Sequence, residues 1–265
     1  MGIFNINPLY KLIGLCFMSA YTPFLTADQQ DEFYWKHRVY LASYPRTGSH
    51  WIRYLLEEAT GLVTSSVYQD MDFPEHMSIV FPWGGYCPDH GYEGMAKYPS
   101  ENDVVVVKTH FPIGDRTKFN HLPYSRIIRI VRHPIDTIYA HHMRFWKSDI
   151  PEDQAKIELT EAIRAWRMFH EYWDSMPNVF TVRYEDLLIN QKFFLKKILL
   201  EADFSFLKED IERAVRRYPP IGIPLKHLSH FNEEDLKTIE LELEDLMEKY
   251  GYSISLILDW KQDQD

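Results

Sequence analysis

The sequence predicts a single α/β domain with a central parallel sheet flanked by helices, and three segments lead to this fold class. Residues 39–60 (VYLASYPRTGSHWIRYLLEEAT) pass from an apolar, β-branched run to a helical pattern, which is typical of a strand, a loop and a helix. Residues 103–112 contain four consecutive valines, as expected of a strand buried on both faces. Residues 125–132 (SRIIRIVR) predict a third strand, and Pro134 marks the start of the following helix.

The rest of the chain is interpreted by the same criteria. Residues 61–102 contain scattered proline, glycine and aromatic residues, which predict a long loop that contributes to an acceptor-binding wall. The other expected elements are a helix over 152–176, a strand over 178–184, one helix from 184 to near 202, and helices over 207–218 and 232–250.

Length and charge limit the possible functions. The 265 residues suit one large domain. With 29 basic and 39 acidic residues the net charge is −10, which argues against a general binder of nucleic acids. An anionic ligand must therefore be held by a local pocket. The two cysteines, Cys16 and Cys87, lie far apart and indicate neither a disulfide framework nor a zinc site.

The loop over residues 44–50 (YPRTGSH) is the first candidate site. It brings two hydroxyls, an arginine and the unpaired backbone N–H groups of a helix start to one place, which suits a phosphate. The pattern G-x-x-x-x-G-K-[ST] is absent, which argues against an ordinary ATP or GTP loop. A strand-to-helix turn without a ligand is the alternative interpretation.

Two further candidates follow the other predicted strands. Lys108, Thr109 and His110 come at the end of the second strand, and Arg132 comes at the end of the third. Ligands of open α/β sheets bind beyond the carboxyl ends of the strands. A neutral imidazole in this position can accept a proton from a hydroxyl group near pH 7.

Four segments together resemble the sulfotransferases that use 3′-phosphoadenosine 5′-phosphosulfate (PAPS). Residues 44–51 (YPRTGSHW) are similar to the family's Y-P-K-S-G-T-T-W loop. Residues 108–112 resemble its catalytic segment, residues 132–136 its R-N-P-x-D element, and residues 184–187 its Y-E-D-L segment, in the family's order. The resemblance implies a P-loop-like sulfotransferase fold.

The resemblance also implies roles for individual residues. His110 would be the catalytic base, Lys108 would stabilise the sulfuryl oxygens, and Arg46 stands where the family has a lysine beside the leaving 5′-phosphate. No metal is required. The cofactor-binding residues would be Arg46, Thr47, Gly48, Ser49 and His50 for the 5′-phosphate, Arg132 for the 3′-phosphate, and Trp51 and Tyr184 for the adenine.

The chain departs from the family pattern at several positions. His133 replaces an asparagine, and Ala140 stands where a phosphate-binding serine is usual. Many family members have a C-terminal R-K-G-x-x-G loop. In residues 219–231 of this chain, only Gly222 and Lys226 resemble it. These changes put more of the 3′-phosphate binding on Arg132.

Two pairs of histidines remain. We expect His141 and His142 to be solvated helix residues, and help to Arg132 in binding the 3′-phosphate is the alternative. His227 and His230 lack a third ligand, and so does the pair of Cys87 and His90, so no metal site is predicted.

The predicted function is transfer of a sulfuryl group from PAPS to an acceptor hydroxyl, which leaves adenosine 3′,5′-bisphosphate (PAP). Two alternatives stay open. A nucleotide-dependent phosphotransferase would need a magnesium-binding carboxylate and a phosphate-loop lysine. An inactive PAPS- or PAP-binding protein is suggested by Arg46 and Ala140. The acceptor, of whatever type, must carry a hydroxyl group.

Residues 1–30 are predicted to be an apolar leader that precedes a domain over 31–265. Residues 12–27 follow a lysine and have the outline of a secretory signal, although polar residues interrupt them. The alternative is a segment that packs on the domain or adheres weakly to a membrane. Because PAPS must be present in the same compartment, we expect the cytoplasm, with membrane association, the Golgi lumen or export as the alternatives.

Overall fold

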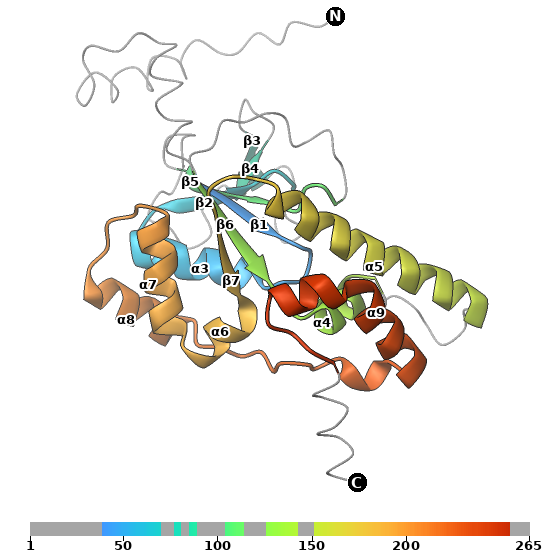
Figure 1. Ribbon diagram of the computed structural model, residues 1–265. Helices are drawn as coiled ribbons and strands as arrows, with labels where there is room; N and C mark the ends of the chain where they lie inside the picture. The colour runs from blue at the N-terminus through green and yellow to red at the C-terminus, as the bar shows by residue number, and fades with distance from the viewer. Residues whose placement is uncertain are drawn as a thin grey trace, which may run out of the picture.

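The computed structural model describes residues 39–69, 77–80, 85–88, 104–113, 126–142 and 151–254. The strands of this part of the chain are β1 (Val39–Ser43), β2 (Val63–Ser66), β3 (Ser78–Val80), β4 (Tyr86–Pro88), β5 (Val104–Thr109), β6 (Arg126–Val131) and β7 (Val179–Arg183). They form one seven-stranded sheet in the order β3-β4-β2-β5-β1-β6-β7 (Figure 1). The strands β2, β5, β1, β6 and β7 run parallel, and β4 and β3 extend the sheet in antiparallel fashion.

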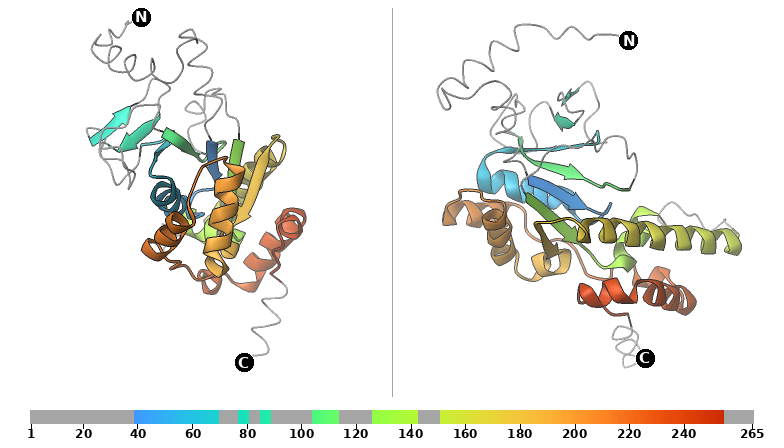
Figure 2. Two further views of the ribbon diagram at one scale, coloured as in Figure 1. Left: turned by 90° about the vertical axis from the view of Figure 1, so that its left-hand side faces the viewer. Right: turned by 45° about the horizontal axis from the view of Figure 1, so that its top comes forward.

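Helices cover both faces of this sheet (Figures 1 and 2). They are α3 (Ser49–Thr60), α4 (Pro134–His141), α5 (Glu152–Asp174), α6 (Tyr184–Ile189), α7 (Gln191–Glu201), α8 (Lys208–Arg217), the 3₁₀ turn η5 (Leu228–His230) and α9 (Glu233–Lys249). The predicted α/β class with a central, mostly parallel sheet flanked by helices is confirmed.

The central strand β1 shows why the strand sequences are continuously apolar. Val39 and Leu41 pack with α3, α7 and α8, whereas Tyr40 and Ala42 pack with α4, α5 and α9. All four side chains are at most 2% exposed. Successive side chains of a strand point to opposite faces, so a sheet covered on both sides needs apolar residues at every position. Truncating Leu41 to alanine would cost about 2–5 kcal/mol of stability.

Two sequence predictions about these elements are wrong. Residues 61–102 were expected to form a loop, but β2, β3 and β4 lie within them. The helix expected from Tyr184 to near residue 202 is two helices. Asn190, with φ −141°, ends α6, and its Oδ1 accepts a hydrogen bond from the N–H of Phe193 at 3.3 Å, which caps α7.

The predicted leader, residues 1–30, lies outside the described residues. Across the described ranges, no helix combines the length and apolar character that a membrane span requires.

Candidate functional site

The four segments singled out in the sequence follow the carboxyl ends of four adjacent strands. Residue 42 of β1 pairs with residue 109 of β5, residue 43 with residue 130 of β6, and residue 131 of β6 with residue 183 of β7. His110, the loop at residues 44–48, Arg132 and Tyr184 each come directly after one of these strands. Parallel pairing in register therefore brings all four to one edge of the sheet.

The loop at residues 44–48 is a tight turn that leads into α3. The N–H and the hydroxyl of Thr47 both donate to the carbonyl of Tyr44, and the Thr47 side chain is fully buried. Gly48 precedes the helix with φ +92°, a conformation that favours glycine. Arg46 also has a positive φ of 68°, and its side chain is exposed. The first backbone N–H groups of α3 have no carbonyl partner within the helix and can bind an anion.

Tyr184 lies against this loop. A Cβ atom at Gly48 would lie 2.7 Å from Cε2 of the Tyr184 ring, so only glycine allows this contact. Trp51 meets the same ring edge-on at 5.6 Å between centroids. The guanidinium carbon of Arg132 lies 4.5 Å from the ring centroid. The Tyr184 side chain, 7% exposed, is therefore enclosed by the candidate nucleotide-binding residues.

His110 is held by the end of β1. Its Nδ1 lies 2.6 Å from the carbonyl oxygen of Ser43, and its ring stacks on Tyr68 with 5.7 Å between centroids. Because a carbonyl only accepts hydrogen bonds, Nδ1 carries the proton and Nε2 of the neutral ring has a lone pair. The pKa of His110 is lowered to about 3, mainly by burial and secondly by the charge of Lys108. The imidazole is consequently neutral at physiological pH.

Lys108 lies in β5, two residues before His110, and is 5% exposed. Its charge is among the causes that lower the pKa of His110, and so are the charges of His50 and His141. These residues therefore lie within electrostatic reach of one another. A buried ammonium group beside a neutral imidazole suits a site where negative charge must be bound.

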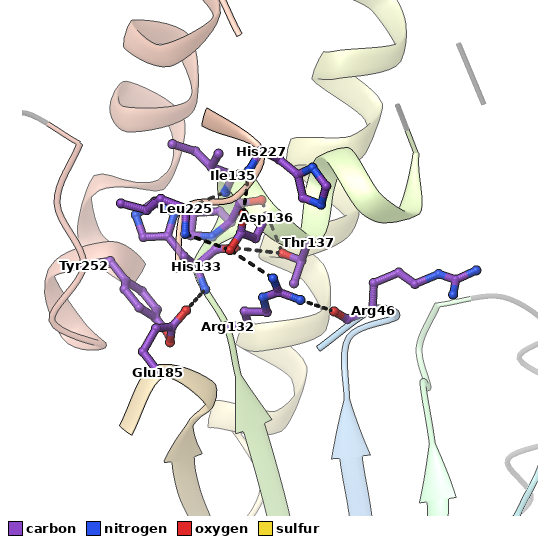
Figure 3. A network of polar contacts seen from close by, with 11 residues as sticks. Arg46, Arg132, His133, Ile135, Asp136, Thr137, Glu185, Leu225, His227 and Tyr252 are labelled. Atoms are coloured by element: carbon purple, nitrogen blue, oxygen red, sulfur yellow. Dashed lines mark hydrogen bonds and ion pairs between the residues drawn. The ribbon is translucent and has the colours of Figure 1, made fainter. Parts of the chain in front are cut away.

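Arg132, which follows β6, connects this strand to the loop at residues 44–48. Its Nη1 donates to the backbone carbonyl of Arg46 at 3.1 Å, and its Nη2 bonds Oδ2 of Asp136 at 3.0 Å (Figure 3). The side chain of Arg46 extends away from that of Arg132 in this view. In the sequence, Asp136 was only the last residue of the segment that resembles R-N-P-x-D, with no binding role assigned to it. Its carboxylate is completely buried beside the candidate site.

His133 has the structural role that an asparagine at a helix start would have. Its Nδ1 accepts the N–H of Ile135 at 3.3 Å, which caps α4. Its own N–H donates to Glu185, which also accepts the Tyr252 hydroxyl at 2.7 Å (Figure 3). Burial, followed by the charge of Arg183, lowers the pKa of His133 to about 3. The departure from the family pattern therefore preserves a neutral acceptor at this position.

The expectation that His141 and His142 are merely solvated is wrong. Nε2 of His142 lies 2.6 Å from the hydroxyl of Tyr44, and His141 meets the Tyr44 ring edge-on at 5.5 Å. Both histidines thus pack on the loop that follows β1. The aromatic residue at position 44 and a histidine at the end of α4 were visible in the sequence, but their approach depends on the order of the strands.

No group of three or more His, Cys, Asp or Glu side chains that could hold a metal ion occurs among the described residues.

Comparison with known proteins connects this geometry with one family. The model of a family described as the sulfotransferase family matches residues 86–206. A Drosophila melanogaster protein, WSCD family member CG9164, is 26% identical over 205 residues, which cover 72% of this chain and 58% of that protein. Mouse sulfotransferase 6B1 is 27% identical over 188 residues, which cover 66% of this chain and 57% of that protein. The chain thus matches a little over half the length of these relatives.

A solved structure has the same fold. Mouse sulfotransferase SULT7A1 complexed with PAP matches with a TM-score of 0.50 and 18% sequence identity. The match covers 79% of this chain and 83% of that one.

Proposed function

Because this chain is a divergent member of the sulfotransferase family, we propose that it transfers a sulfuryl group from PAPS to an acceptor hydroxyl and releases PAP. One observation carries the proposal: the loop after β1, His110, Arg132 and Tyr184 follow four adjacent parallel strands and share one edge of the sheet. The mouse structure with the same fold is complexed with PAP, which supports the choice of donor.

The residues at this edge of the sheet suit a nucleotide that carries phosphates at the 3′ and 5′ positions of its ribose. The start of α3, with Gly48 in the left-handed region, offers backbone donors for the 5′-phosphate together with Ser49 and His50. Thr47 was also expected to bind this phosphate, but its N–H and hydroxyl both donate to the Tyr44 carbonyl, so its role is to hold the turn. Arg132 would bind the 3′-phosphate. Its contact with the Arg46 carbonyl connects the two ends of the site. Trp51 and Tyr184 would supply the aromatic contacts to the adenine.

When bound, PAPS supplies the sulfuryl group and a phosphate leaving group. Transfer places the attacking and leaving oxygens on opposite sides of sulfur, so the protein contributes mainly by orienting groups and balancing charge. Nε2 of His110 would accept the proton of the acceptor hydroxyl. The Lys108 ammonium would stabilise the sulfuryl oxygens, and Arg46 would neutralise the 5′-phosphate. Arg46 keeps its charge but cannot donate a proton as a lysine can.

Calorimetry with PAP, ATP, ADP and AMP tests the donor class. We expect PAP to bind more tightly than AMP by at least tenfold, because the 3′-phosphate adds a charge-assisted contact to Arg132. Equal affinities, or a preference for ATP with magnesium, would contradict the proposal and favour a phosphotransferase. PAP binding without transfer to a panel of phenols, sugars and alcohols would support an inactive nucleotide-binding protein instead.

A further inference from the structure

A segment far along the chain closes over Tyr184. We call residues 219–227, which connect α8 to η5, the strap. A Cβ atom at Gly222 would lie 2.1 Å from the Tyr184 hydroxyl oxygen and 3.0 Å from Cζ, so the strap backbone rests directly on this side chain. Gly48 meets the same ring from the loop after β1. Tyr184 is therefore in close contact with two glycines from distant parts of the chain.

The residue just before the strap is held through its backbone carbonyl. The oxygen of Tyr218 accepts hydrogen bonds from Nε1 of Trp51 at 3.0 Å and from Nε2 of Gln191 at 2.6 Å. Trp51 is one of the candidate adenine contacts. The start of the strap is thereby tied to the candidate nucleotide site.

Asp136 attaches the other end. Its Oδ2 accepts the N–H of Leu225 at 3.0 Å, and its Oδ1 accepts the N–H of His227 at 3.1 Å (Figure 3). Oδ2 also bonds Nη2 of Arg132 at 3.0 Å. A fully buried carboxylate is unfavourable without such donors. One buried charge thus joins the strap, α4 and Arg132.

The backbone of the strap is shaped by this attachment. Leu225 has a φ of +57°, a region that a branched apolar residue rarely adopts. Such a conformation persists only where surrounding contacts maintain it. The N–H of this residue is one of the two that Asp136 binds.

We propose that Asp136 is a positioning residue of the nucleotide site, which holds Arg132 and the strap in one arrangement around Tyr184. The inference rests on the proposed function, in which Arg132 binds the 3′-phosphate. Asp136 fixes one guanidinium nitrogen, the Arg46 carbonyl fixes another, and the Tyr184 ring packs against the guanidinium group. A side chain oriented before binding loses less conformational entropy when it meets its ligand.

If only its charge mattered, removing the Asp136 carboxylate would raise the affinity for PAP, which is the opposite of what positioning predicts. The carboxylate is a negative group beside the candidate phosphate site, so its removal would strengthen anion binding if only Coulomb attraction mattered. Loss of positioning would weaken the same binding. The sign of the change in PAP affinity therefore separates the two explanations.

The first test measures PAP and AMP binding to the full chain by calorimetry. For Asp136→Asn we expect the affinity for PAP to fall about tenfold, and that for AMP to change by less than about twofold. The matched control is Glu58→Gln. Glu58 is another buried carboxylate, held by Arg213 and Arg217 near the far end of α3, and its variant should leave both affinities unchanged. Unchanged or tighter PAP binding to Asp136→Asn would overturn the inference.

The second test removes the contact of the strap without touching Asp136. Gly222→Ala places a methyl group against the Tyr184 hydroxyl and displaces the ring on which the Arg132 guanidinium packs. Because Arg132 contacts only the 3′-phosphate, the affinity for PAP should fall about tenfold more than the affinity for AMP. Ile221→Ala is the control, because Ile221 is in the same strap but is 90% exposed. This pair decides the question even if Asp136→Asn does not fold. A Gly222→Ala variant with wild-type selectivity would contradict a role for the strap.

Hydrogen exchange without nucleotide tests the attachment itself. In Asp136→Asn the amides of Leu225 and His227 should exchange at least tenfold faster than in wild type, and wild-type rates would overturn the inference. If wild-type protein binds PAP and AMP equally, the proposed function fails and the inference falls with it. If wild type prefers PAP and all variants keep that preference, the inference alone fails.

Discussion

Nδ1 of His110 donates to the carbonyl oxygen of Ser43 across 2.6 Å, so the last residue of β1 sets the tautomer of a histidine that follows β5. Ser43 also precedes the loop that leads to α3. The candidate base and the candidate phosphate loop are therefore positioned by the same strand end. A change in the pairing of β1 with β5 would displace both.

We expect His110→Ala to reduce sulfuryl transfer by about 10²–10⁴-fold, the usual contribution of a general base. PAP affinity should change by less than about threefold, because the phosphate-binding groups remain. Transfer is measured with the best acceptor from a panel of hydroxyl compounds, and affinity by calorimetry. His230→Ala, which removes an exposed histidine of η5, is the control and should retain activity. Transfer by His110→Ala at the wild-type rate would exclude His110 as the base.

The acid stability of the protein should depend on His133. Its folded-state pKa is about 3, while an unfolded histidine has a pKa near 6.5. The unfolded state therefore binds a proton at higher pH than the folded state does, and stability falls as the pH drops from about 6.5 towards 3. At pH 5 one such histidine accounts for about 1–2 kcal/mol of lost stability.

His133→Asn keeps an acceptor for the N–H of Ile135 but does not titrate. Urea unfolding at pH 7.5 and pH 5 should show a smaller difference for this variant than for wild type. An equal loss of stability in both proteins would show that His133 does not carry this pH dependence.

Strands β1, β5 and β6 were predictable because their sequences are apolar at nearly every position, as burial on both faces of a sheet requires. β5 has four valines in succession, and β6 has three isoleucines and a valine among its six residues, as a strand covered on both faces requires. The short strand β2 was missed because its sequence, Val-Thr-Ser-Ser, carries little hydrophobic signal. It is a strand because it pairs with β5 on one side and β4 on the other.

The parts of the site that sequence reasoning missed are contacts between distant segments. Asp136 fits the first turn of any helix, and nothing local indicates that its carboxylate binds amides about 90 residues later. The pairing of Tyr44 with His142 likewise follows from the packing of α4 beside β1. Asn190 did carry a local signal, since asparagine is a strong N-cap, but a continuous apolar pattern outweighed it.

Gly48→Ala should weaken nucleotide binding more than its cost in stability explains. A methyl group there meets the Tyr184 ring at 2.7 Å, and the φ of +92° is strained for alanine. The strain alone is worth about 1–2 kcal/mol. Gly61→Ala, at the other end of α3 with φ +70°, carries a similar strain and is the control.

We expect both glycine variants to lose stability in thermal unfolding, but only Gly48→Ala to lose PAP affinity, by tenfold or more. If Gly61→Ala loses as much affinity, the effect comes from general destabilisation of the helix and not from the contact with Tyr184.

The hydrogen bond of 2.6 Å between Tyr44 and His142 should couple the loop after β1 to α4 energetically. Tyr44→Phe and His142→Asn each remove one partner, and a double-mutant cycle isolates the interaction between them. We expect a coupling energy of about 1 kcal/mol in urea unfolding, the usual size of a partly buried hydrogen bond. Because Tyr44 begins the phosphate loop, both single variants should also bind PAP more weakly, and the double variant should lose no more than either one. Fully additive losses in stability and affinity would show that the two residues act independently, and that this hydrogen bond does not position the loop.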